Sequence, residues 1–505
     1  MANQSTLSAF LAAGSPVEAQ RPWPRVQISE AGWRGAVDQL AQGRLVLLGL
    51  FGEPHTVHMA LLDEVQADIA VVSLGCPGGR FPTVSGTHAP AIHLERAIYD
   101  LFGLEAEGAL DERPWLDHGV WGIHAPLGAQ PRRPSAVDPY VFLPVEGEGL
   151  HQIPVGPVHA GIIEPGHFRF TANGETVVRL EERLGYVHKG IEGLMAGADL
   201  GRAAKLAGRT SGDSTVAYAL AFARAAEAAT GAEVPPRAVW LRALMAELER
   251  IANHLGDIGA ICNDAAFALM HAHCGVLREL VLRAADACFG HRLMMDRIVP
   301  GGVASDLAPE GVAELRRLLT QVRRRFPELV ELYDNTASLQ DRTVATGWVA
   351  ADLVRRFGAG GHVGRAAGRA FDARKSPGYP PYHELEFDLP VRSESDVNAR
   401  VWVRIREVEQ SLALIEQILE RLPDGNLRID VPAVAGESMA LVEAFRGDVL
   451  AWLRLDQSGR VQRCHLRDPS WFQWPLLEAA IEGNIVADFP LCNKSFNCSY
   501  SGHDL

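Results

Sequence analysis

The spacing of apolar residues changes along this chain, and the change constrains the possible folds more than any single motif does. Up to about residue 104 the apolar runs are short, which is typical of strands. From Ser214 onward, apolar residues recur every three or four positions over long stretches, which is typical of helices that bury one face. The sequence therefore predicts an α+β protein built from two unlike parts.

The first part combines three strand-like runs with one helical pattern. The strand-like runs are 45–48, 55–62 and 69–74. A helix is expected over Ile92–Phe102, because its apolar residues fall on one face and Gly103 suits a helix end. We interpret this part as a small α/β domain.

The second part begins after a stretch between Pro114 and Pro157 that is rich in Pro and Gly, as linkers and extended arms are. It opens with a β-hairpin around Asn173-Gly174, the strongest short hairpin signal. The regions we expect are a leader over 1–40 that can be mobile, the small domain over 41–125, a linker over 126–155, and a large helix bundle with β extensions over 156–505.

Within the large domain, Pro and turn residues divide the helical pattern into segments. The expected helices are 214–229, one from Pro235-Pro236 through Leu255, 277–295, one after Pro309, and one from Ser395 to just before Pro423. The expected strands are 439–455, interrupted by a turn at 446–448, and 461–467. The apolar stripes of these helices are interpreted as core and not as a cofactor-binding surface.

Composition excludes several classes of protein. The 505 residues carry a net charge of −14 and no block rich in Lys and Arg, which argues against a nucleic-acid-binding surface. The seven cysteines include no C-x-x-C pair, so the chain encodes neither a disulfide framework nor a cysteine-bound iron–sulfur cluster, and a reducing cytoplasmic setting is expected. No apolar run reaches the roughly 20 residues of a membrane-spanning helix. We therefore expect the chain to meet a membrane only through partner subunits.

Two short segments, far apart in the sequence, place small polar residues at the same spacing. Ser211 and Ser214 are separated by two residues, and so are Cys498 and Ser501. Thiols at all four places would form two C-x-x-C pairs that could converge on one pair of metal ions. Only Cys498 is a thiol, so the sequence alone leaves open whether this is a lost metal site or a coincidence.

Several strings are similar to two subunits of respiratory complex I. Glu95–Gly103 resembles the signature of the 30 kDa subunit. Gly156–His159, followed by Leu184–Glu192, is similar to the start of the 49 kDa subunit and of the large subunit of membrane-bound nickel–iron hydrogenases. The strings 247–255, 442–447 and 484–490 agree with the same family. The chain thus resembles a fusion of the two subunit types, like the large subunit of group 4, energy-converting hydrogenases of the formate hydrogenlyase kind.

This resemblance also implies a loss. In active hydrogenases of the family, an R-x-C-G-x-C segment and a terminal C-x-x-C supply the four thiolates that hold nickel and iron. Here serines replace three of them, and a serine hydroxyl stays protonated near neutral pH. The resemblance implies a chain with no metal and no cofactor of its own, and a vacated cavity near Ser211, Ser214, Cys498 and Ser501.

Complex I suggests a use for such a cavity. Its homologous subunit has also lost the four cysteines and binds a quinone headgroup through a histidine and a tyrosine. His159 matches that histidine, whereas Gly212 stands at the tyrosine position and Tyr218, Tyr500 and Asp213 are expected nearby. Quinone is therefore a candidate ligand.

The candidate catalytic residues are three groups that can carry protons, His159, Glu164 and Asp213. His159 and Glu164, together with His167, precede the hairpin and could relay protons, since histidine titrates near neutral pH. The alternative is that they cap a buried loop. Asp213 lies between two former ligand positions, with Arg209 as its expected partner; the alternative is a simple surface acid.

Two further groups of residues are expected to be structural. His188 and Glu192 are one helical turn apart and are expected to pair charges. His503, close to the chain end, is expected to be solvated, although it could act as a relay.

The resemblance implies a peripheral-arm subunit of a membrane-anchored, complex I-like or hydrogenase-related redox complex. Such a subunit joins an iron–sulfur small subunit to antiporter-like and anchor subunits of the membrane, on the inner face of the cell membrane, and couples electron transfer to ion or proton movement. The alternatives are a non-catalytic scaffold of such a complex and a hydrogenase with atypical ligands.

Overall fold

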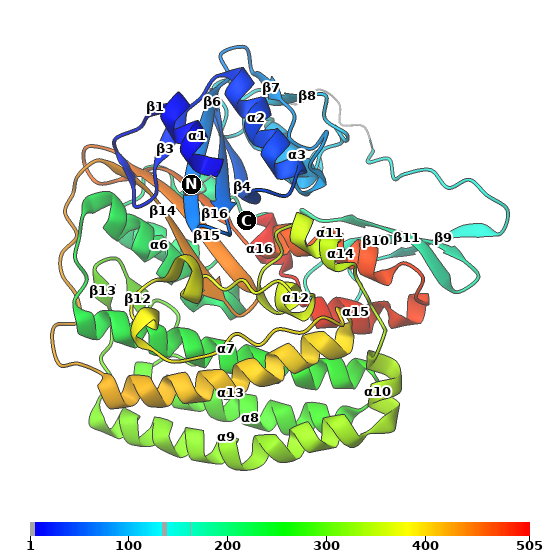
Figure 1. Ribbon diagram of the computed structural model, residues 1–505, viewed down its shortest axis with the longest axis vertical. Coiled ribbons are helices and arrows are strands. Elements are labelled where there is room, and N and C mark those ends of the chain that lie inside the picture. The colour runs from blue at the N-terminus through cyan, green and yellow to red at the C-terminus, as the bar shows by residue number, and fades with distance from the viewer. Residues whose placement is uncertain (1–5, 134–138, 162) are drawn as a thin grey trace, which may run out of the picture.

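The computed structural model describes residues 6–133, 139–161 and 163–505, which form two parts packed against each other (Figure 1). The small part consists of the N-terminal strands and helices, and the large part contains the long helices and a second sheet. Within these described ranges, no helix is both long and apolar enough to cross a bilayer.

A five-stranded sheet forms the centre of the small domain, in the order β1-β3-β6-β5-β4. Its strands are β1 (Ser15–Pro16), β3 (Arg25–Gln27), β4 (Val46–Glu53), β5 (Thr56–Asp63) and β6 (Asp68–Gly75). The three long strands are buried along most of their length and not on alternate residues, as expected of strands covered on both faces. Helices α2 (Glu30–Ala41) and α3 (Ile92–Phe102) share a core with one set of strand residues, and the other set packs into the core of the large domain.

The predicted helix over Ile92–Phe102 is confirmed, and it ends at Gly103 in the left-handed conformation, with φ of 69°. A short parallel pair, β7 (Arg80–Pro82) and β8 (Glu105–Glu107), flanks this helix. The predicted strand runs are confirmed as parts of β4, β5 and β6.

Residues 6–40, which we expected to be a leader, belong to the small domain instead. They form α1 (Thr6–Ala13), β1, β2 (Gln20–Arg21), β3 and most of α2. The indole of Trp33 is fully buried, and Arg25 forms an ion pair with Glu437 of the large domain. The apolar residues of 6–40 show neither helical nor strand periodicity in the sequence. The reason is that these elements are short and are buried by neighbours distant in sequence. Residues 1–5 lie outside the described part of the chain.

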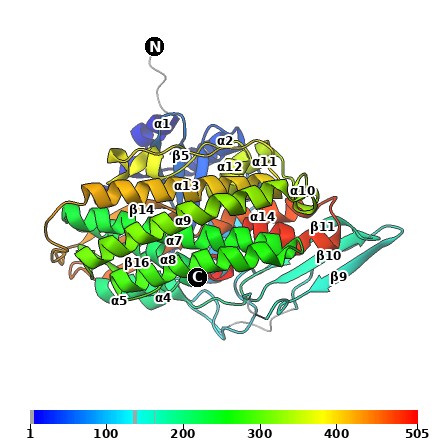
Figure 2. The same cartoon turned by 90° about the horizontal axis from the view of Figure 1, so that it is seen from below.

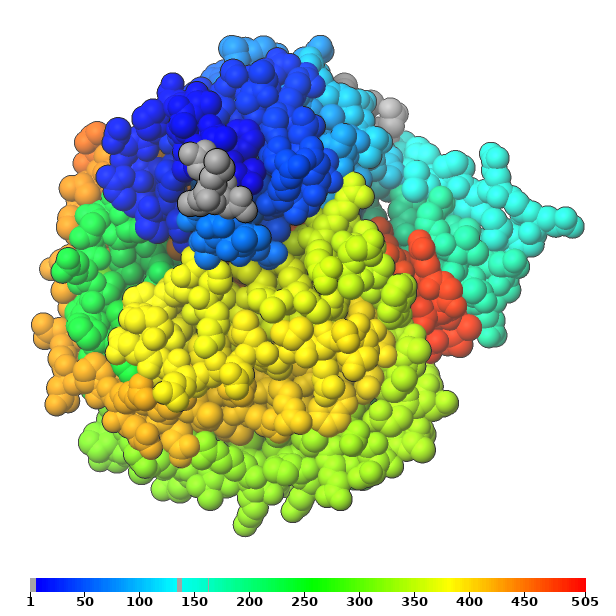
Figure 3. Space-filling model, viewed as in Figure 1, coloured from blue at the N-terminus to red at the C-terminus, as the bar shows by residue number. Residues whose placement is uncertain are grey.

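An antiparallel sheet of three strands, β11-β10-β9, stands out from the body of the molecule as an arm (Figures 1 and 3). Its strands are β9 (Leu150–Val155), β10 (His167–Asn173) and β11 (Thr176–Arg183). The predicted hairpin is confirmed, since Asn173 pairs with Thr176 across the turn. The last residues of the expected linker, 150–155, are therefore strand, and residues 134–138 lie outside the described ranges.

Long helices make up most of the large domain, and Figures 1 and 2 show four of them, α7, α8, α9 and α13, running side by side. The long helices are α6 (Thr215–Thr230), α7 (Pro236–Asp264), α8 (Ala268–Phe289), α9 (Pro309–Asn335) and α13 (Val397–Arg421). Asp396 caps α13 by accepting the Ala399 N–H at 2.7 Å. The helix expected over 277–295 is α8, which begins earlier and ends at Gly290, with φ of 71°. The other helices of this region are α4 (Ile191–Met195), α5 (Leu200–Gly208), α10 (Ala337–Thr343), α11 (Ala351–Arg356) and α12 (Gly361–Ala366), beside the short strands β12 (Ile298–Val299) and β13 (Gly302–Val303).

A second sheet, in the order β16-β15-β14-β2, lies between the helices and the small domain. Its long strands are β14 (Gly436–Ala444), β15 (Gly447–Leu455) and β16 (Val461–Arg467). Strands β14 and β15 join through Phe445 and Arg446, so the guanidinium of Arg446 is held at a tight turn. The last helices, α14 (Ser470–Ile481), α15 (Phe489–Phe496) and α16 (Tyr500–Asp504), return the chain end to the middle of the molecule (Figure 1).

Candidate functional site

The structure brings together the two segments that the sequence singled out. The loop between α5 and α6 carries Ser211, and the turn between α15 and α16 carries Ser499; their hydroxyl oxygens are 3.2 Å apart. The two residues are separated by 288 positions in the sequence. The loop and the chain end therefore form one site.

Arg446 lies between these two segments. Its guanidinium donates to both carboxylate oxygens of Asp213, at 2.8 and 2.6 Å, and to the Ser214 hydroxyl at 3.1 Å. It also donates to the backbone carbonyl of Asn497. An arginine side chain thus lies within the region near Ser211, Ser214, Cys498 and Ser501 where we expected a vacated cavity.

The partner that we expected for Asp213 is wrong. Arg209 points to the surface and pairs with Asp296, with one nitrogen–oxygen distance of 2.8 Å. Burial alone would raise the pKa of Asp213, but the Arg446 guanidinium and two serine hydroxyls outweigh it and hold this pKa at about 2. Asp213 is therefore ionised at neutral pH, although about a third of its side chain, 36%, is exposed.

A second carboxyl group, Glu249 of α7, lies near Asp213. It accepts the Val216 and Ala217 N–H groups at the start of α6, at 2.8 and 3.1 Å, and forms no ion pair with any residue in the described ranges. Burial raises its pKa to about 8 against these hydrogen bonds, and the negative Asp213 adds to the rise. Both acids line one narrow cleft of about 10 Å³, enough for about one water molecule. Two nearby acids with pKa values on opposite sides of neutral pH are typical of sites that move protons.

The donor set does not fit the nickel–iron group of active relatives. The Ser211 hydroxyl donates to Asp213 at 2.7 Å and is already engaged. Burial raises the pKa of the Cys498 thiol well above its usual value, so it is not a thiolate at neutral pH. A permanent cation, Arg446, stands between the two segments, where a cationic metal pair would need anionic ligands.

His159 and Glu164 both contact the chain end. The Nε2 atom of His159 is 3.2 Å from the Tyr500 hydroxyl, and Glu164 accepts the Ser501 N–H at 2.9 Å. Gly166 permits this approach, because a Cβ there would lie 2.6 Å from the Tyr500 ring. His159 and Glu164 thus contact the chain end directly, whereas Asp213 reaches it through Ser211, and their roles in moving protons stay predictions.

His167 does not join this group. Its Nδ1 atom is 3.3 Å from the Gly156 carbonyl oxygen, and Arg169 donates to its Nε2 atom at 3.3 Å. Tyr218, which we expected near the site, donates to Asp468 at 2.5 Å. Both side chains therefore serve the packing around the site.

The chain end is buried, contrary to our expectation of a solvated His503. The His503 ring is fully buried and stacks on Trp471, with ring centroids 4.0 Å apart, and Trp115 donates to it at 3.1 Å. The next residue, Asp504, accepts the Gly185 and Val187 N–H groups at 2.9 and 3.0 Å. These contacts tie the last helix to the loop after β11.

The expected charge pair between His188 and Glu192 is not what the structure shows. His188 Nδ1 lies 2.6 Å from the Asp504 carbonyl oxygen. Glu192 instead contacts Arg463 at 2.7 Å and His465 at 2.8 Å, on β16. Both residues are structural, but through other partners.

A network of buried charges connects the site with the helix bundle. Asn497 donates to Asp257 of α7 at 2.8 Å, and Arg404 of α13 donates to the other Asp257 oxygen at 3.1 Å. Deeper in the bundle, Glu407 contacts His254 at 2.6 Å and also pairs with Arg365. The site is thus connected by hydrogen bonds to helices α7 and α13.

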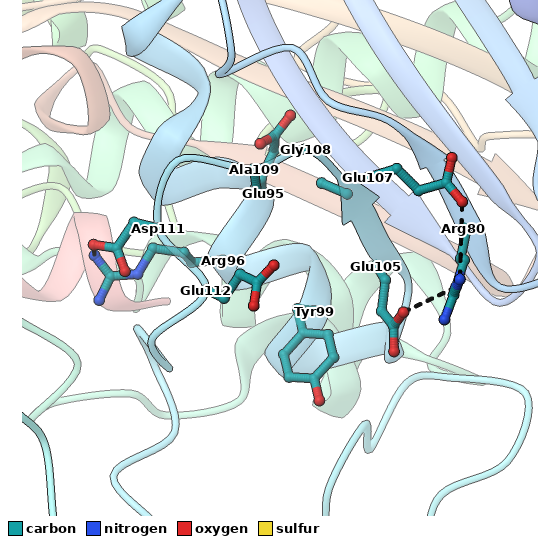
Figure 4. A pocket seen from close by; sticks show the side chains of 11 residues that line it. Arg80, Glu95, Arg96, Tyr99, Glu105, Glu107, Gly108, Ala109, Asp111 and Glu112 are labelled. Atoms are coloured by element: carbon teal, nitrogen blue, oxygen red, sulfur yellow. Dashed lines mark hydrogen bonds and ion pairs between the residues drawn. The ribbon is translucent and has the colours of Figure 1, made fainter.

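A hollow with several acidic side chains lies elsewhere, on the small domain (Figure 4). It measures about 380 Å³ and is lined only by residues between 80 and 112. Two of its lining residues, Arg80 and Glu105, form an ion pair at 3.0 Å. This hollow shares no described residue with the site.

Sequence reasoning missed Arg446 and Glu249 as site residues, although both lie in strings that resemble the family. Arg446 is at the turn inside 442–447, and Glu249 is in 247–255. A charged residue at a tight turn between two buried strands was the available signal for Arg446, and a buried acid on an apolar helix was the signal for Glu249. Neither signal identifies the partner, because both partners are distant in sequence.

Comparison with known proteins gives matches over most of the chain. A family model described as "Respiratory-chain NADH dehydrogenase, 49 Kd subunit" matches residues 264–435 and 429–504. Formate hydrogenlyase subunit 5 of Escherichia coli (strain K12) is 31% identical over 84% of this chain and 77% of its own length. An NADH-quinone oxidoreductase subunit of Roseiflexus sp. (strain RS-1) is 32% identical over 67% of this chain and 94% of its own.

A solved structure agrees with these matches. One chain of the membrane-bound sulfane sulfur reductase, an archaeal respiratory membrane complex, superposes with a TM-score of 0.67 at 26% identity. The superposition covers 72% of this chain and 100% of that chain.

These matches, together with the fold and the two-segment site, define the class: large peripheral-arm subunits of complex I-like and hydrogenase-related membrane complexes. Within that class, the chain belongs to the family of the respiratory-chain NADH dehydrogenase 49 kDa subunit. The 84% coverage by the formate hydrogenlyase subunit is more than residues 156–505 alone supply, so that relative also matches part of the small domain. The resemblance stated from the sequence is confirmed.

Proposed function

We propose that this subunit moves protons at the site between residues 209–214 and the chain end, without a nickel–iron centre of its own. Electrons pass through an iron–sulfur partner subunit, and antiporter-like and anchor subunits hold the assembly on the inner face of the cell membrane. The names of the relatives support this, since they belong to formate hydrogenlyase, NADH-quinone oxidoreductase and a membrane-bound sulfane sulfur reductase. These complexes differ in the substrate that their names give, so the shared subunit supports a shared coupling task.

The observation that carries the proposal is the pair of acids in the narrow cleft. Asp213 is held ionised by Arg446, whereas Glu249 keeps its proton near neutral pH. A charge change nearby alters the balance between them, because each acid senses the field of the other. Weakening the Arg446–Asp213 ion pair would raise the pKa of Asp213 and let it accept a proton.

The test uses the whole complex, purified with its partners and placed in lipid vesicles that contain a pH-sensitive dye. A reduced viologen supplies electrons, and the protons moved per electron are measured. We expect Asp213→Asn and Glu249→Gln to lower this ratio at least roughly tenfold, since general acid–base groups contribute that much or more. Asp424→Asn, at a fully exposed position after α13, is the matched control and should leave the ratio unchanged.

Two results would contradict the proposal. An unchanged proton ratio in both variants would favour a scaffold that only holds the complex together. Nickel in a one-to-one ratio with the chain, with hydrogen/deuterium exchange activity, would favour a hydrogenase with atypical ligands.

Quinone binding is a second candidate function, favoured by one contact. A histidine and a tyrosine, His159 and Tyr500, lie in hydrogen-bond contact beside the chain end. A quinone carbonyl can accept from both groups. A quinone analogue carrying a photoreactive group should label this segment, and Tyr500→Phe should weaken the labelling; equal labelling of both proteins would contradict quinone binding here.

A further inference from the structure

A second pair of acids, Glu182 and Glu478, lies near the chain end. Glu182 lies on β11 and is 1% exposed. Neither of its carboxylate oxygens has a hydrogen-bond partner among the described residues. Glu478 lies on α14, is only partly buried, and accepts the backbone N–H of Glu182 at 2.8 Å. The inner acid is therefore linked to an acid that borders the surface.

Among the residues that the structure describes, no cation is paired with either acid. In the described part of the chain, no Lys, Arg or His forms an ion pair with either carboxyl group. The neighbouring Glu181 shows the contrast, since it pairs with Arg113 at 2.6 Å. A buried carboxylate without a counter-charge is costly, so such a group keeps its proton.

The inner acid faces the ring cluster that holds the chain end. Glu182 is directly opposite Phe168 across the strand pair, so the two side chains share one face of the arm. The Phe168 ring packs against Trp474 and Tyr500, with centroids 6.1 and 6.5 Å away. Tyr500 in turn contacts His159 at 3.2 Å. Glu182 is thus next to the side of the site formed by His159 and Tyr500.

We propose that Glu182 and Glu478 form a proton-carrying site that connects the buried chain end with the surface of α14. The step is a transfer of a proton only: one carboxyl oxygen loses it, a water or the other carboxyl oxygen gains it, and no electron moves. Glu478 exchanges protons with solvent, and Glu182 passes them toward Tyr500 and His159. The role of this pair in coupling rests on the proposed function, whereas the protonation of the two carboxyl groups does not.

The groups around the pair explain its pH behaviour. Glu181 of β11, Glu482 at the end of α14, and Cys498 and Tyr500 near the chain end interact with the pair electrostatically, and the cation Arg96 of α3 acts on Glu478. The pKa of Glu478 is raised to about 8, because burial, helped by Glu181 and Glu482, outweighs the opposing Glu182 N–H and Arg96. Burial and the proximity of Glu478 raise the pKa of Glu182 well above its usual value. Glu478 therefore changes charge near pH 8, whereas Glu182 holds its proton more strongly than an ordinary glutamate.

Infrared spectroscopy of the whole complex tests the protonated pair without any turnover. A buried protonated carboxyl gives a carbonyl band that a carboxylate lacks. We expect the wild-type complex at neutral pH to show such a band, which weakens as the pH rises through about 8 for Glu478. Glu182→Gln and Glu478→Gln should each remove part of it, while Glu175→Gln, exposed at the turn of the same hairpin, should not. A wild-type spectrum without this band would overturn the proposal, and it needs no variant.

The vesicle assay then tests the connection to the site. Both Gln variants should keep electron transfer and lose at least about tenfold in protons moved per electron, whereas Glu175→Gln should match the wild type. Normal proton movement in both variants would overturn the connection. If Asp213→Asn has no effect but the carboxyl band is present and lost in the Gln variants, the proposed function fails while the protonated pair stands.

Discussion

The guanidinium of Arg446 and the carboxylate of Asp213 lie 2.6 Å apart, although 233 residues separate them in the sequence. Arg446 also donates to the Ser214 hydroxyl and to a carbonyl of the chain-end segment. One side chain therefore joins the loop, the strand turn and the chain end. The ion pair stabilises the region where the sequence resemblance places the former metal ligands.

Replacing Arg446 should destabilise the protein more than replacing an exposed arginine. Arg446→Met leaves Asp213 without its partner and should lower the free energy of unfolding by about 2 kcal/mol, less than for a fully buried pair because part of Asp213 is exposed. Arg209→Met breaks the exposed pair with Asp296 and should cost below about 1 kcal/mol. Urea unfolding of both variants measures the difference, and equal losses would contradict a special role for Arg446.

The ion pair should also make stability depend on pH in the acid range. The pKa of Asp213 is lowered from 3.8 to about 2 in the folded chain. A lowered pKa contributes stability above the unfolded value, and this contribution is lost as the pH falls through the folded value. Between about pH 4 and pH 2 the wild type should lose about 1 kcal/mol more than Asp213→Asn, after discounting for solvent screening. Urea unfolding at several pH values measures this difference. If the free energy of unfolding of the two proteins fell equally between about pH 4 and pH 2, the lowered pKa of Asp213 would be contradicted.

The buried charges of the bundle should matter more than the exposed ones on the same helix. Glu407 of α13 is buried and contacts both His254 and Arg365, whereas Glu416, further along α13, pairs with Arg323 at the surface. Glu407→Gln leaves Arg365 with less compensation and should cost about 3 kcal/mol. Glu416→Gln, the matched control, should cost below about 1 kcal/mol. Thermal unfolding separates the two, and a small loss in Glu407→Gln would show that Glu443 and Asp372 alone balance Arg365.

The order of the long helices and strands could be predicted because the apolar residues of each one are spaced as its own type of secondary structure requires. The hairpin at Asn173-Gly174 and the helix over Ile92–Phe102 need only neighbours in the sequence to form. The short elements before Ala41 could not be predicted, since β2 pairs with β14 and Arg25 pairs with Glu437. Their structure depends on contacts that no local pattern contains.

The sequence predicted which two segments form the candidate site, but it did not predict which side chains pair within it. The matching spacing of Ser211, Ser214, Cys498 and Ser501 indicated which two segments to compare, and the structure brings them together. The partner of Asp213 was predicted as Arg209 because Arg209 is close in sequence. In the structure Arg209 pairs with Asp296 instead. Arg446, at the turn between β14 and β15, is the residue that pairs with Asp213. An acid such as Glu182, whose carboxylate oxygens have no hydrogen-bond partner among the described residues, can be recognised only when its burial is known.

Gly166 should be needed for the contact between His159 and Tyr500. A Cβ at Gly166 would lie 2.6 Å from the Tyr500 ring and 3.2 Å from Leu184, so Gly166→Ala must displace the ring. We expect a loss of about 1–3 kcal/mol in stability, together with lower proton movement in the vesicle assay. Gly161→Ala, in the same loop, meets no atom within 4 Å and is the control. Identical behaviour of the two variants would show that Tyr500 adjusts without cost.

Cys498, the one thiol retained among the four positions, should be dispensable for redox turnover. Its side chain is buried and its pKa is raised well above the usual value, so it is a packed thiol and not an anionic ligand. Cys498→Ser completes a set of four hydroxyls at the four positions and should cost about 1 kcal/mol in stability, because a buried hydroxyl is less well accommodated than a thiol. Electron transfer and nickel content of the purified complex should stay at the wild-type level. A folded variant that loses turnover would mean that the thiol takes part in the reaction, and it would restore the case for a metal centre with atypical ligands.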